Sequence, residues 1–152
     1  MLNPDIIIRH FTQSDQVAAR ALILNGLGEH FGFIDETLNP DLDNITASYL
    51  APGHLFLVAE RQRVLVGTGA LLFLPESTGQ LVRISTHRAY RRLGIARSIC
   101  QRLIEHARQR GLRRLIVETN RDWYDAIRLY QQLGFREEAS NEQGYLFGMD
   151  LS

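Results

Sequence analysis

The residues with the clearest chemical potential form a short basic, glycine-containing run near the middle of the chain. Residues 91–96 read Arg91-Arg92-Leu93-Gly94-Ile95-Ala96, a basic-x-x-Gly-x-Ala pattern. An alternating strand is expected just before this run, at 81–86, and an amphipathic helix just after it, ending at Gly111. A strand-to-helix turn of this kind points backbone N–H groups, the positive end of a helix dipole and guanidinium groups at one spot. The sequence therefore predicts a pyrophosphate-binding site.

The elements expected around this turn give an α/β (α+β) fold with the order β-α-α-β-β-β-α-β-α-β-β. Short alternating or apolar runs predict the strands, at 5–11, 55–60, 64–74, 80–86, 115–119, 135–138 and 145–150. Capping residues and apolar positions at helical spacing predict the helices, at 14–28, 39–50, 95–110 and 122–133. We expect one mixed sheet flanked by helices. Because no linker-like segment interrupts the chain, residues 1–152 are expected to form one domain.

The composition is typical of a folded domain in a reducing compartment. The chain has 152 residues, of which 45% are hydrophobic and 22% charged, and this length suits one core. No apolar stretch approaches the roughly 18 residues of a membrane span, and the first residues lack the pattern of a secretory signal. The one cysteine, Cys100, excludes an internal disulfide. We therefore expect a cytoplasmic protein with no membrane partner.

Charge is distributed unevenly along the chain, although the net charge is zero. All 17 basic residues are arginines, and 13 of them lie between Arg83 and Arg136 beside four acids, a balance of +9. Residues 1–60 hold eight acids and two arginines, a balance of −6. An arginine-rich segment can bind nucleic acid or a phosphorylated cofactor. Residues 108–114 lack interleaved aromatic side chains and any known binding motif, so no nucleic-acid partner is expected.

Two further patterns are not expected to carry out chemistry. Gly67-Thr68-Gly69 follows a strand as a dinucleotide-binding loop does, but Leu72 stands at the third glycine position and the strand continues. The five histidines have no spacing typical of metal ligands, and Cys100 lies on the apolar stripe of its helix. No metal site is expected.

Two motifs resemble those of the GNAT superfamily of acyl-CoA-dependent N-acetyltransferases. Residues 83–97 are similar to its central cofactor motif, with Ala96 where glycine is common and Arg88 where proline is frequent. The next motif of the family is similar to a second set of residues: Asn120, Trp123, Ala126 and Leu129-Tyr130-x-x-Leu133-Gly134-Phe135. The resemblance implies acetyl-CoA as cosubstrate and an amine as acceptor.

The resemblance also implies how acetyl-CoA is bound. In this family the strands that match 81–86 and 115–119 splay apart, and pantetheine amides pair with the first strand's backbone, here at Ile84 and Thr86. N–H groups of residues 92–96 would hold the pyrophosphate, which Gly94 allows to approach closely. The arginines that meet the 3′-phosphate stay unassigned. The expected cofactor contacts are Ile84, Thr86, Arg91, Arg92, Leu93, Gly94, Ile95, Ala96, Arg97, Asn120 and Ala126.

The catalytic groups implied by the resemblance are only partly assigned. Tyr130 matches the family's general acid, which would protonate the departing thiolate; the alternative is a packing role on a core-facing helix stripe. Asn120 would bind pantetheine or, alternatively, cap the next helix. A lysine-like amine of pKa ~10.4 must lose a proton before it attacks. The candidates for the base are Glu118, His30 beside Glu29, His87 and bound water.

The expected function is direct transfer of an acetyl group from acetyl-CoA to a primary amine of a small molecule or peptide, in a ternary complex. A non-catalytic acyl-CoA sensor on the same fold is the first alternative, and an arginine-rich nucleic-acid binder the second. A homodimer is left open. Acids of the first segment are expected to draw a cationic amine toward the acceptor pocket: Glu29, Asp35, Glu36, Asp41 and Asp43.

Overall fold

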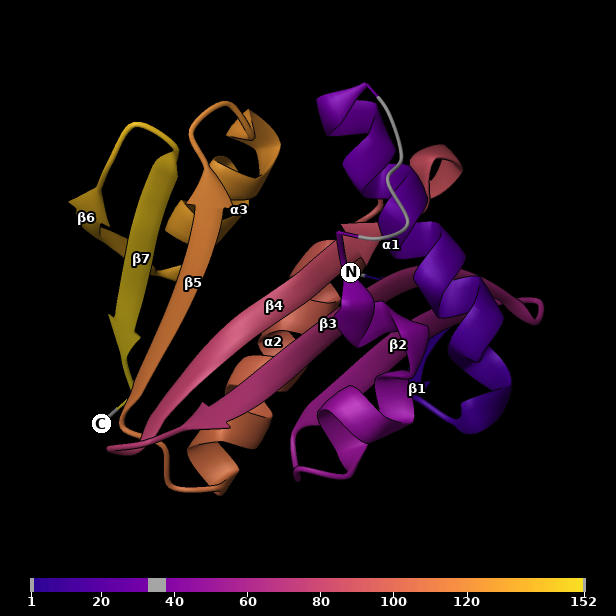
Figure 1. Cartoon of the computed structure of the whole chain (residues 1–152), viewed down its shortest axis with the longest axis horizontal. Coiled ribbons are helices and arrows are strands. Elements are labelled where there is room, and N and C mark those ends of the chain that lie inside the picture. Colours follow the sequence, from indigo (N-terminus) through magenta and orange to yellow (C-terminus); the bar gives the residue numbers. More distant parts are fainter. Residues whose placement is uncertain (1, 33–37, 152) are drawn as a thin grey trace.

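Seven strands form one mixed sheet in the computed structural model, which describes residues 2–32 and 38–151 (Figure 1). Their order across the sheet is β1-β2-β3-β4-β5-β7-β6. Neighbouring strands are antiparallel, except β4 and β5, which are parallel. The predicted fold class and element order are confirmed. The strands are β1 (Ile6–His10), β2 (Leu55–Arg61), β3 (Val64–Leu74), β4 (Thr78–Thr86), β5 (Arg114–Asn120), β6 (Arg136–Ser140) and β7 (Gly144–Asp150).

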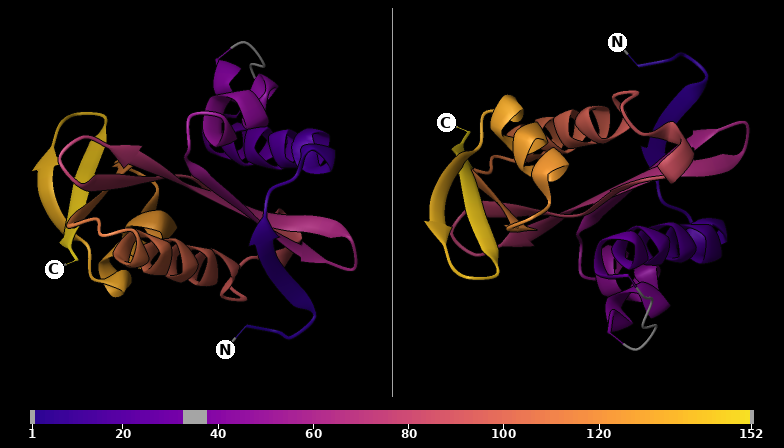
Figure 2. Two further views of the ribbon diagram at one scale, coloured as in Figure 1. Left: turned by 90° about the horizontal axis from the view of Figure 1, so that it is seen from below. Right: turned by 90° about the horizontal axis from the view of Figure 1, so that it is seen from above.

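Helices cover both faces of the sheet (Figure 2). The front face carries α1 (Gln16–Phe31), preceded by η1 (Gln13–Asp15), and two short turns, η2 (Pro40–Asp43) and η3 (Thr46–Leu50). The back face carries α2 (Ile95–Gln109), preceded by η4 (Arg88–Tyr90), and α3 (Tyr124–Leu133). Each face therefore has its own core. No helix in the described part of the chain is long and apolar enough to cross a membrane.

The first predicted helix differs from the observed α1 at its end. The glycines at 26–28 predict an end there, but α1 continues to Phe31 and ends where Gly32 adopts φ +80°. Gly26 serves packing instead, because a Cβ at this position would lie 3.1 Å from the Ser85 hydroxyl of β4. α1 consequently lies close against the end of β4.

The helix predicted at 39–50 is not one continuous α-helix. Its first part is the 3₁₀ turn η2, with Pro40 at its start, and its second part is the π-helical turn η3. The predicted apolar face is nevertheless buried, since Leu42, Ile45 and Tyr49 are at most 6% exposed. Tertiary packing thus preserves the apolar side although the backbone is irregular.

The Gly67-Thr68-Gly69 run lies within β3, as the prediction against a dinucleotide loop requires. A Cβ on Gly67 would lie 2.6 Å from Ile95, and one on Gly69 would lie 2.4 Å from Ile99. These glycines let α2 pack directly on the sheet. They therefore fix the position of the turn that precedes α2.

Candidate active site

The strands β4 and β5 separate halfway along their length. They pair only over residues 78–81 and 114–117, yet β4 continues to Thr86 and β5 to Asn120. Figure 1 shows the two strands diverging beyond this stretch. Past Leu81 and Val117 their facing edges have no ladder partner within the described residues. Such an edge can take an extended ligand as an additional strand.

A β-bulge in β4 lies where the strands diverge. The register with β3 shifts between Thr68 and Ala70, so residues 83 and 84 lie opposite Gly69 alone. Arg83 adopts φ +56° there, a conformation that costs a non-glycine residue about 1 kcal/mol or more. The Thr68 hydroxyl donates to the Arg83 carbonyl at 2.8 Å and supports the bulge. A β-bulge changes the direction in which side chains point. Here the Ile84 side chain packs against the core of the back face, whereas the Arg83 side chain points to the front face, where it binds Asp41.

On the front face, the Arg83 guanidinium is bound by the segment that enters η2. Nη2 donates to Asp41 Oδ1 at 2.7 Å and to Asn39 Oδ1 at 3.1 Å, and Nε donates to Asp41 Oδ2 at 3.1 Å. The Tyr49 hydroxyl donates to the same carboxylate at 2.5 Å. Burial opposes ionisation of Asp41, but the hydrogen bonds from Arg83 and Tyr49 outweigh it and hold its pKa below the ordinary value. Burial and the bond to Asp41 raise the pKa of Tyr49 to about 12.

The turn before α2 has the backbone geometry of an anion site. Arg92 has φ +64° and Gly94 φ +84°, and Gly94 is the N-cap of α2 without a side-chain cap. The Ser98 N–H donates to the Gly94 carbonyl at 3.0 Å, so the N–H groups of residues 95–97 have no partner within the helix. A hollow of about 500 Å³ opens over this turn, lined by Leu2, Arg92, Leu93, Gly94, Arg97, Ser98 and Gln101.

Two guanidinium groups of the turn are held by neighbouring elements. Arg91 Nη1 lies 2.6 Å from Glu29 Oε2 in the last turn of α1. Arg97 Nη2 donates to Gln132 of α3, although Arg97 also lines the hollow. The anion site is thereby linked to both faces of the molecule.

Tyr130 lies under the region where β5 leaves β4. Its ring packs 6.5 Å from that of Phe147, which is the register partner of Val117, and 5.9 Å from that of Phe135. Tyr130 is 5% exposed, yet its hydroxyl makes no hydrogen bond to any residue that the structure describes. Burial raises the pKa of Tyr130 well above its ordinary value, so the phenol keeps its proton at neutral pH.

Thr119 is a candidate site residue that the sequence interpretation missed. Its hydroxyl is buried on the diverged part of β5 and has no hydrogen-bond partner within the described chain. A buried polar atom without a partner is costly and unusual, so this position suits a polar ligand in the opening. The missed signal is the alternation of β5, in which Thr119 is the polar member of an otherwise apolar inward set with Leu115 and Val117.

The remaining predicted cofactor residues lie along the same opening. Asn120 ends β5, and it does not cap α3, whose N-cap is Trp123, so the capping alternative is wrong. Ala126 packs against the back core from α3. Ile84 and Thr86 are both partly buried on the half of β4 that pairs with β3 but not with β5.

The candidate bases have different surroundings. Glu118 is exposed, and strand alternation places it on the front face, opposite the buried Val117 and Thr119. It makes no hydrogen bond or ion pair to any described residue. His87 Nδ1 accepts from the Ala89 N–H at 3.1 Å and thus caps η4. The His30 side chain lies outside what the structure describes.

The acids expected to draw a cationic amine are largely neutralised. Asp41 is paired with Arg83 at 2.7 Å, Glu29 with Arg91 at 2.6 Å and Asp43 with Arg20 at 3.4 Å. Asp35 and Glu36 lie outside the described residues. The sequence interpretation treated these carboxylates as free charges. Their arginine partners lie up to 62 positions away along the chain, so the sequence alone does not reveal the ion pairs. No cluster of metal-ligating side chains occurs in the part of the chain that the structure describes.

Comparisons with known proteins agree on the family and the fold. The model of the Acetyltransferase (GNAT) family matches residues 19–135. N-acetyltransferase 8B from Homo sapiens is 35% identical over 111 residues, which cover 69% of this chain and 49% of that protein. The chain therefore spans about half the length of this curated relative.

Solved structures extend the likeness to the whole fold. A GNAT-family acetyltransferase from Staphylococcus aureus Mu50 has a TM-score of 0.88 at 24% identity, covering 97% of this chain and 99% of that chain. An N-acetyltransferase from Thermoplasma acidophilum in complex with coenzyme A has a TM-score of 0.83 at 15% identity, covering 95% and 98%. At these identities the likeness is one of fold.

Proposed function

The chain belongs to the acetyltransferase (GNAT) family, and we propose that it transfers an acetyl group from acetyl-CoA to a primary amine. The observation that carries this proposal is the opening between β4 and β5, with the buried Tyr130 ring packed against Phe147, the register partner of the last paired residue of β5, Val117. From this opening the chain continues from β4 through η4 into the anion-binding turn before α2. One extended ligand along β4 would therefore have its phosphates at the turn and its reacting group at the opening.

Acetyl-CoA would bind along the free edge of β4. Backbone groups of Ile84 and Thr86 would pair with the pantetheine amides, as an additional strand does. Residues 91–97 would receive the pyrophosphate through N–H groups and the α2 dipole. Thr119 and Asn120 would complete the polar contacts from β5, and Ala126 would line the opening from α3. The coenzyme A bound to the Thermoplasma acidophilum relative supports this choice of ligand.

The reaction would be a direct attack. The amine nitrogen bonds to the thioester carbonyl carbon, the C–S bond breaks, and the thiolate takes a proton from the Tyr130 phenol. Burial keeps the Tyr130 phenol protonated at neutral pH, as a proton donor must be, but its raised pKa also makes it a weaker acid, so the transfer depends on the negative charge of the thiolate beside it. A backbone N–H near Thr86 would stabilise the negative charge on the carbonyl oxygen.

The proton of the amine would leave on the front face. Glu118 is the candidate base that the surroundings favour, because it is exposed and unpaired among the described residues. His87 is engaged in capping η4, and Glu29 is paired with Arg91. Bound water linked to Glu118 would serve the same purpose.

Acetyl transfer is tested with purified protein, acetyl-CoA and a broad panel of primary amines. We expect release of free thiol in equal amount to the acetylated amine. Binding of acetyl-CoA without turnover of any amine would overturn the enzymatic proposal and identify an acyl-CoA sensor. Absence of acetyl-CoA binding would overturn the cofactor site as well.

A further inference from the structure

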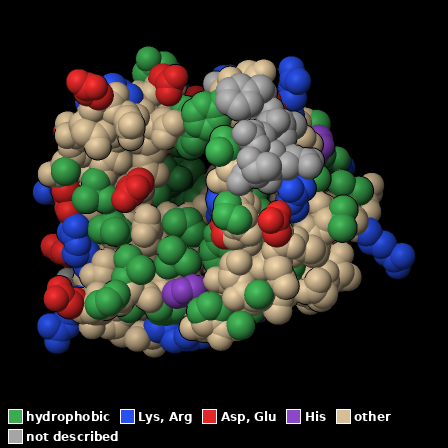
Figure 3. All heavy atoms as spheres, in the orientation of Figure 1, with side chains coloured by type: hydrophobic (Ala, Val, Ile, Leu, Met, Phe, Trp, Pro, Cys, Tyr) green, Lys and Arg blue, Asp and Glu red, His purple; other side chains and the backbone are tan. Residues whose placement is uncertain are grey.

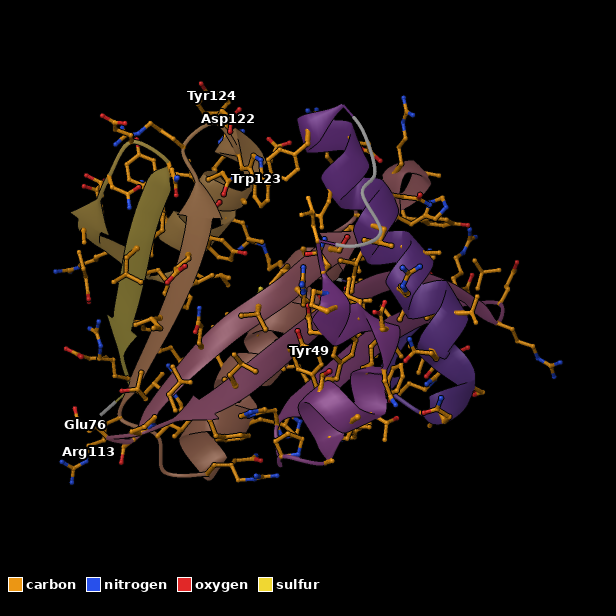
Figure 4. All side chains as sticks on the ribbon, in the orientation of Figure 1. Tyr49, Glu76, Arg113, Asp122, Trp123 and Tyr124 are labelled. Carbon is orange, nitrogen blue, oxygen red and sulfur yellow. The ribbon has the colours of Figure 1, made fainter. Side chains whose placement is uncertain are left out.

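An aromatic bridge joins the two faces of the molecule beside the proposed active site. Phe31 in the last turn of α1 and Trp123 at the start of α3 meet with ring centroids 5.9 Å apart. Figure 4 shows Trp123 pointing from the end of β5 toward α1, while Tyr124 points away from it. The bridge therefore joins α1 on the front face to the start of α3 on the back face, at the end where β4 and β5 diverge and where an acceptor would enter.

The surface around this bridge is apolar and accessible. Phe31 is 51% exposed, and Trp123 is partly exposed. The space-filling view shows a hollow on this side of the molecule with hydrophobic side chains on its walls (Figure 3). Exposed apolar groups gathered around a concavity are typical of ligand-binding sites.

The charges near the opening favour an acceptor with a single positive group. Asp41 and Glu29 are each neutralised by an arginine, which leaves Glu118 as the unpaired carboxylate of the described β5 front face. The Glu118 carboxylate can attract one ammonium group, and the rings of Trp123 and Phe31 offer the rest of the acceptor an apolar contact. An anionic substituent would lose its hydration without a free partner.

From these observations we propose that the acceptor is a primary amine with an apolar or aromatic substituent, and that Trp123 and Phe31 bind this substituent while the amino group faces Glu118. This inference rests on the proposed acetyl transfer and specifies its substrate class. Trp123 and Phe31 are then specificity-determining residues, because they contact the substituent and not the reacting atoms.

The test compares three amines with acetyl-CoA: 2-phenylethylamine, ethylamine and 1,4-diaminobutane. Burial of a phenyl group predicts a kcat/KM at least tenfold higher for 2-phenylethylamine than for either of the others. Trp123→Ala should reduce this preference to less than threefold. Tyr124→Ala, which removes a neighbouring aromatic ring that is 70% exposed, should leave the preference intact. Phe31→Ala provides the same test from α1 if Trp123→Ala does not fold.

The outcomes separate the two proposals. Turnover of all three amines at similar kcat/KM, or preference for the diamine, would overturn the aromatic acceptor site while acetyl transfer stands. A phenyl preference that survives both Trp123→Ala and Phe31→Ala would also overturn it. Thiol release with none of the amines in the broad panel would overturn acetyl transfer itself, and with it this inference.

Discussion

Arg83 and Asp41 are 42 residues apart in the chain, yet two hydrogen bonds of 2.7 and 3.1 Å join their side chains. Arg83 lies in the β4 bulge at φ +56°, and Asp41 lies in η2 on the front face. The pair therefore ties the segment after α1 to the point where β4 leaves β5. Tyr49 donates to the same carboxylate and extends this connection to η3.

Removal of the Asp41 charge should destabilise the fold. Asp41→Asn leaves the Arg83 guanidinium, whose side chain is 19% exposed, without its counter-charge. Breaking a fully buried pair costs roughly 3–5 kcal/mol, and partial exposure reduces our expectation to about 1–3 kcal/mol. Urea unfolding at pH 7 measures the change. Asp43→Asn, at a 62% exposed side chain with a 3.4 Å pair, should change stability by about 0.5 kcal/mol or less; equal losses in both variants would contradict this role of the Arg83–Asp41 pair.

The same pair predicts a particular response to acid. The pKa of Asp41 is lowered from 3.8 in the folded state, so its contribution is present above pH 3.8 and is lost as pH falls through the lower folded value. The stability difference between the native protein and Asp41→Asn should therefore be constant from pH 7 to 5 and shrink below about pH 4. Urea midpoints at pH 7, 5, 4 and 3 measure it. An undiminished difference at pH 3 would exclude this linkage.

The two ends of α2 allow a matched test of the anion site. Gly94 and Gly111 have φ +84° and +76°, and a Cβ at either position would meet no atom within 4 Å. Gly94→Glu and Gly111→Glu thus introduce the same charge and similar backbone strain. Only Gly94→Glu should abolish the thermal shift with acetyl-CoA, which at ~100 times its Kd corresponds to roughly 2.7 kcal/mol. If folded Gly94→Glu keeps the shift, the cofactor does not bind at this turn.

Local patterns in the sequence predicted most elements of the fold. Alternation predicted the strands, and the turn at Gly94 was identified from residue types, because both depend on neighbours along the chain. The end of α1 could not be predicted locally, since the glycines at 26–28 signal a stop while Gly26 stays helical against Ser85 of β4. The separation of β4 and β5 was inferred only from the family resemblance.

The front of the candidate site depends on distant pairings that a single sequence does not reveal. Arg83 was read as part of the cofactor motif, and its bond to Asp41 requires the bulge opposite Gly69. Thr119 was missed because one polar residue in the inward set of Leu115 and Val117 is a weak signal in the sequence. The aromatic bridge between Phe31 and Trp123 joins residues from opposite halves of the chain.

Removal of the Glu29 charge should strengthen cofactor binding. Glu29 Oε2 lies 2.6 Å from Arg91 Nη1, so the carboxylate competes with a pyrophosphate for this guanidinium. An exposed pair of this kind contributes at most about 1 kcal/mol, and Glu29→Gln should lower the Kd for acetyl-CoA about two- to fivefold. Titration calorimetry measures the Kd, and Asp43→Asn, which removes an acid paired elsewhere, should leave it unchanged. Unchanged or weaker binding in Glu29→Gln would contradict the competition.

Replacement of Tyr130 by phenylalanine tests the proposed general acid. Tyr130→Phe keeps the ring that packs against Phe135 and Phe147, so stability and acetyl-CoA affinity should change little. Loss of the phenol proton should lower kcat about 10²-fold or more, within the range of general acid catalysis. Tyr124→Phe removes a hydroxyl from an exposed ring of the same helix and should leave kcat intact. Near-native kcat in folded Tyr130→Phe, with the chemical step shown to be rate-limiting, would assign Tyr130 to packing alone.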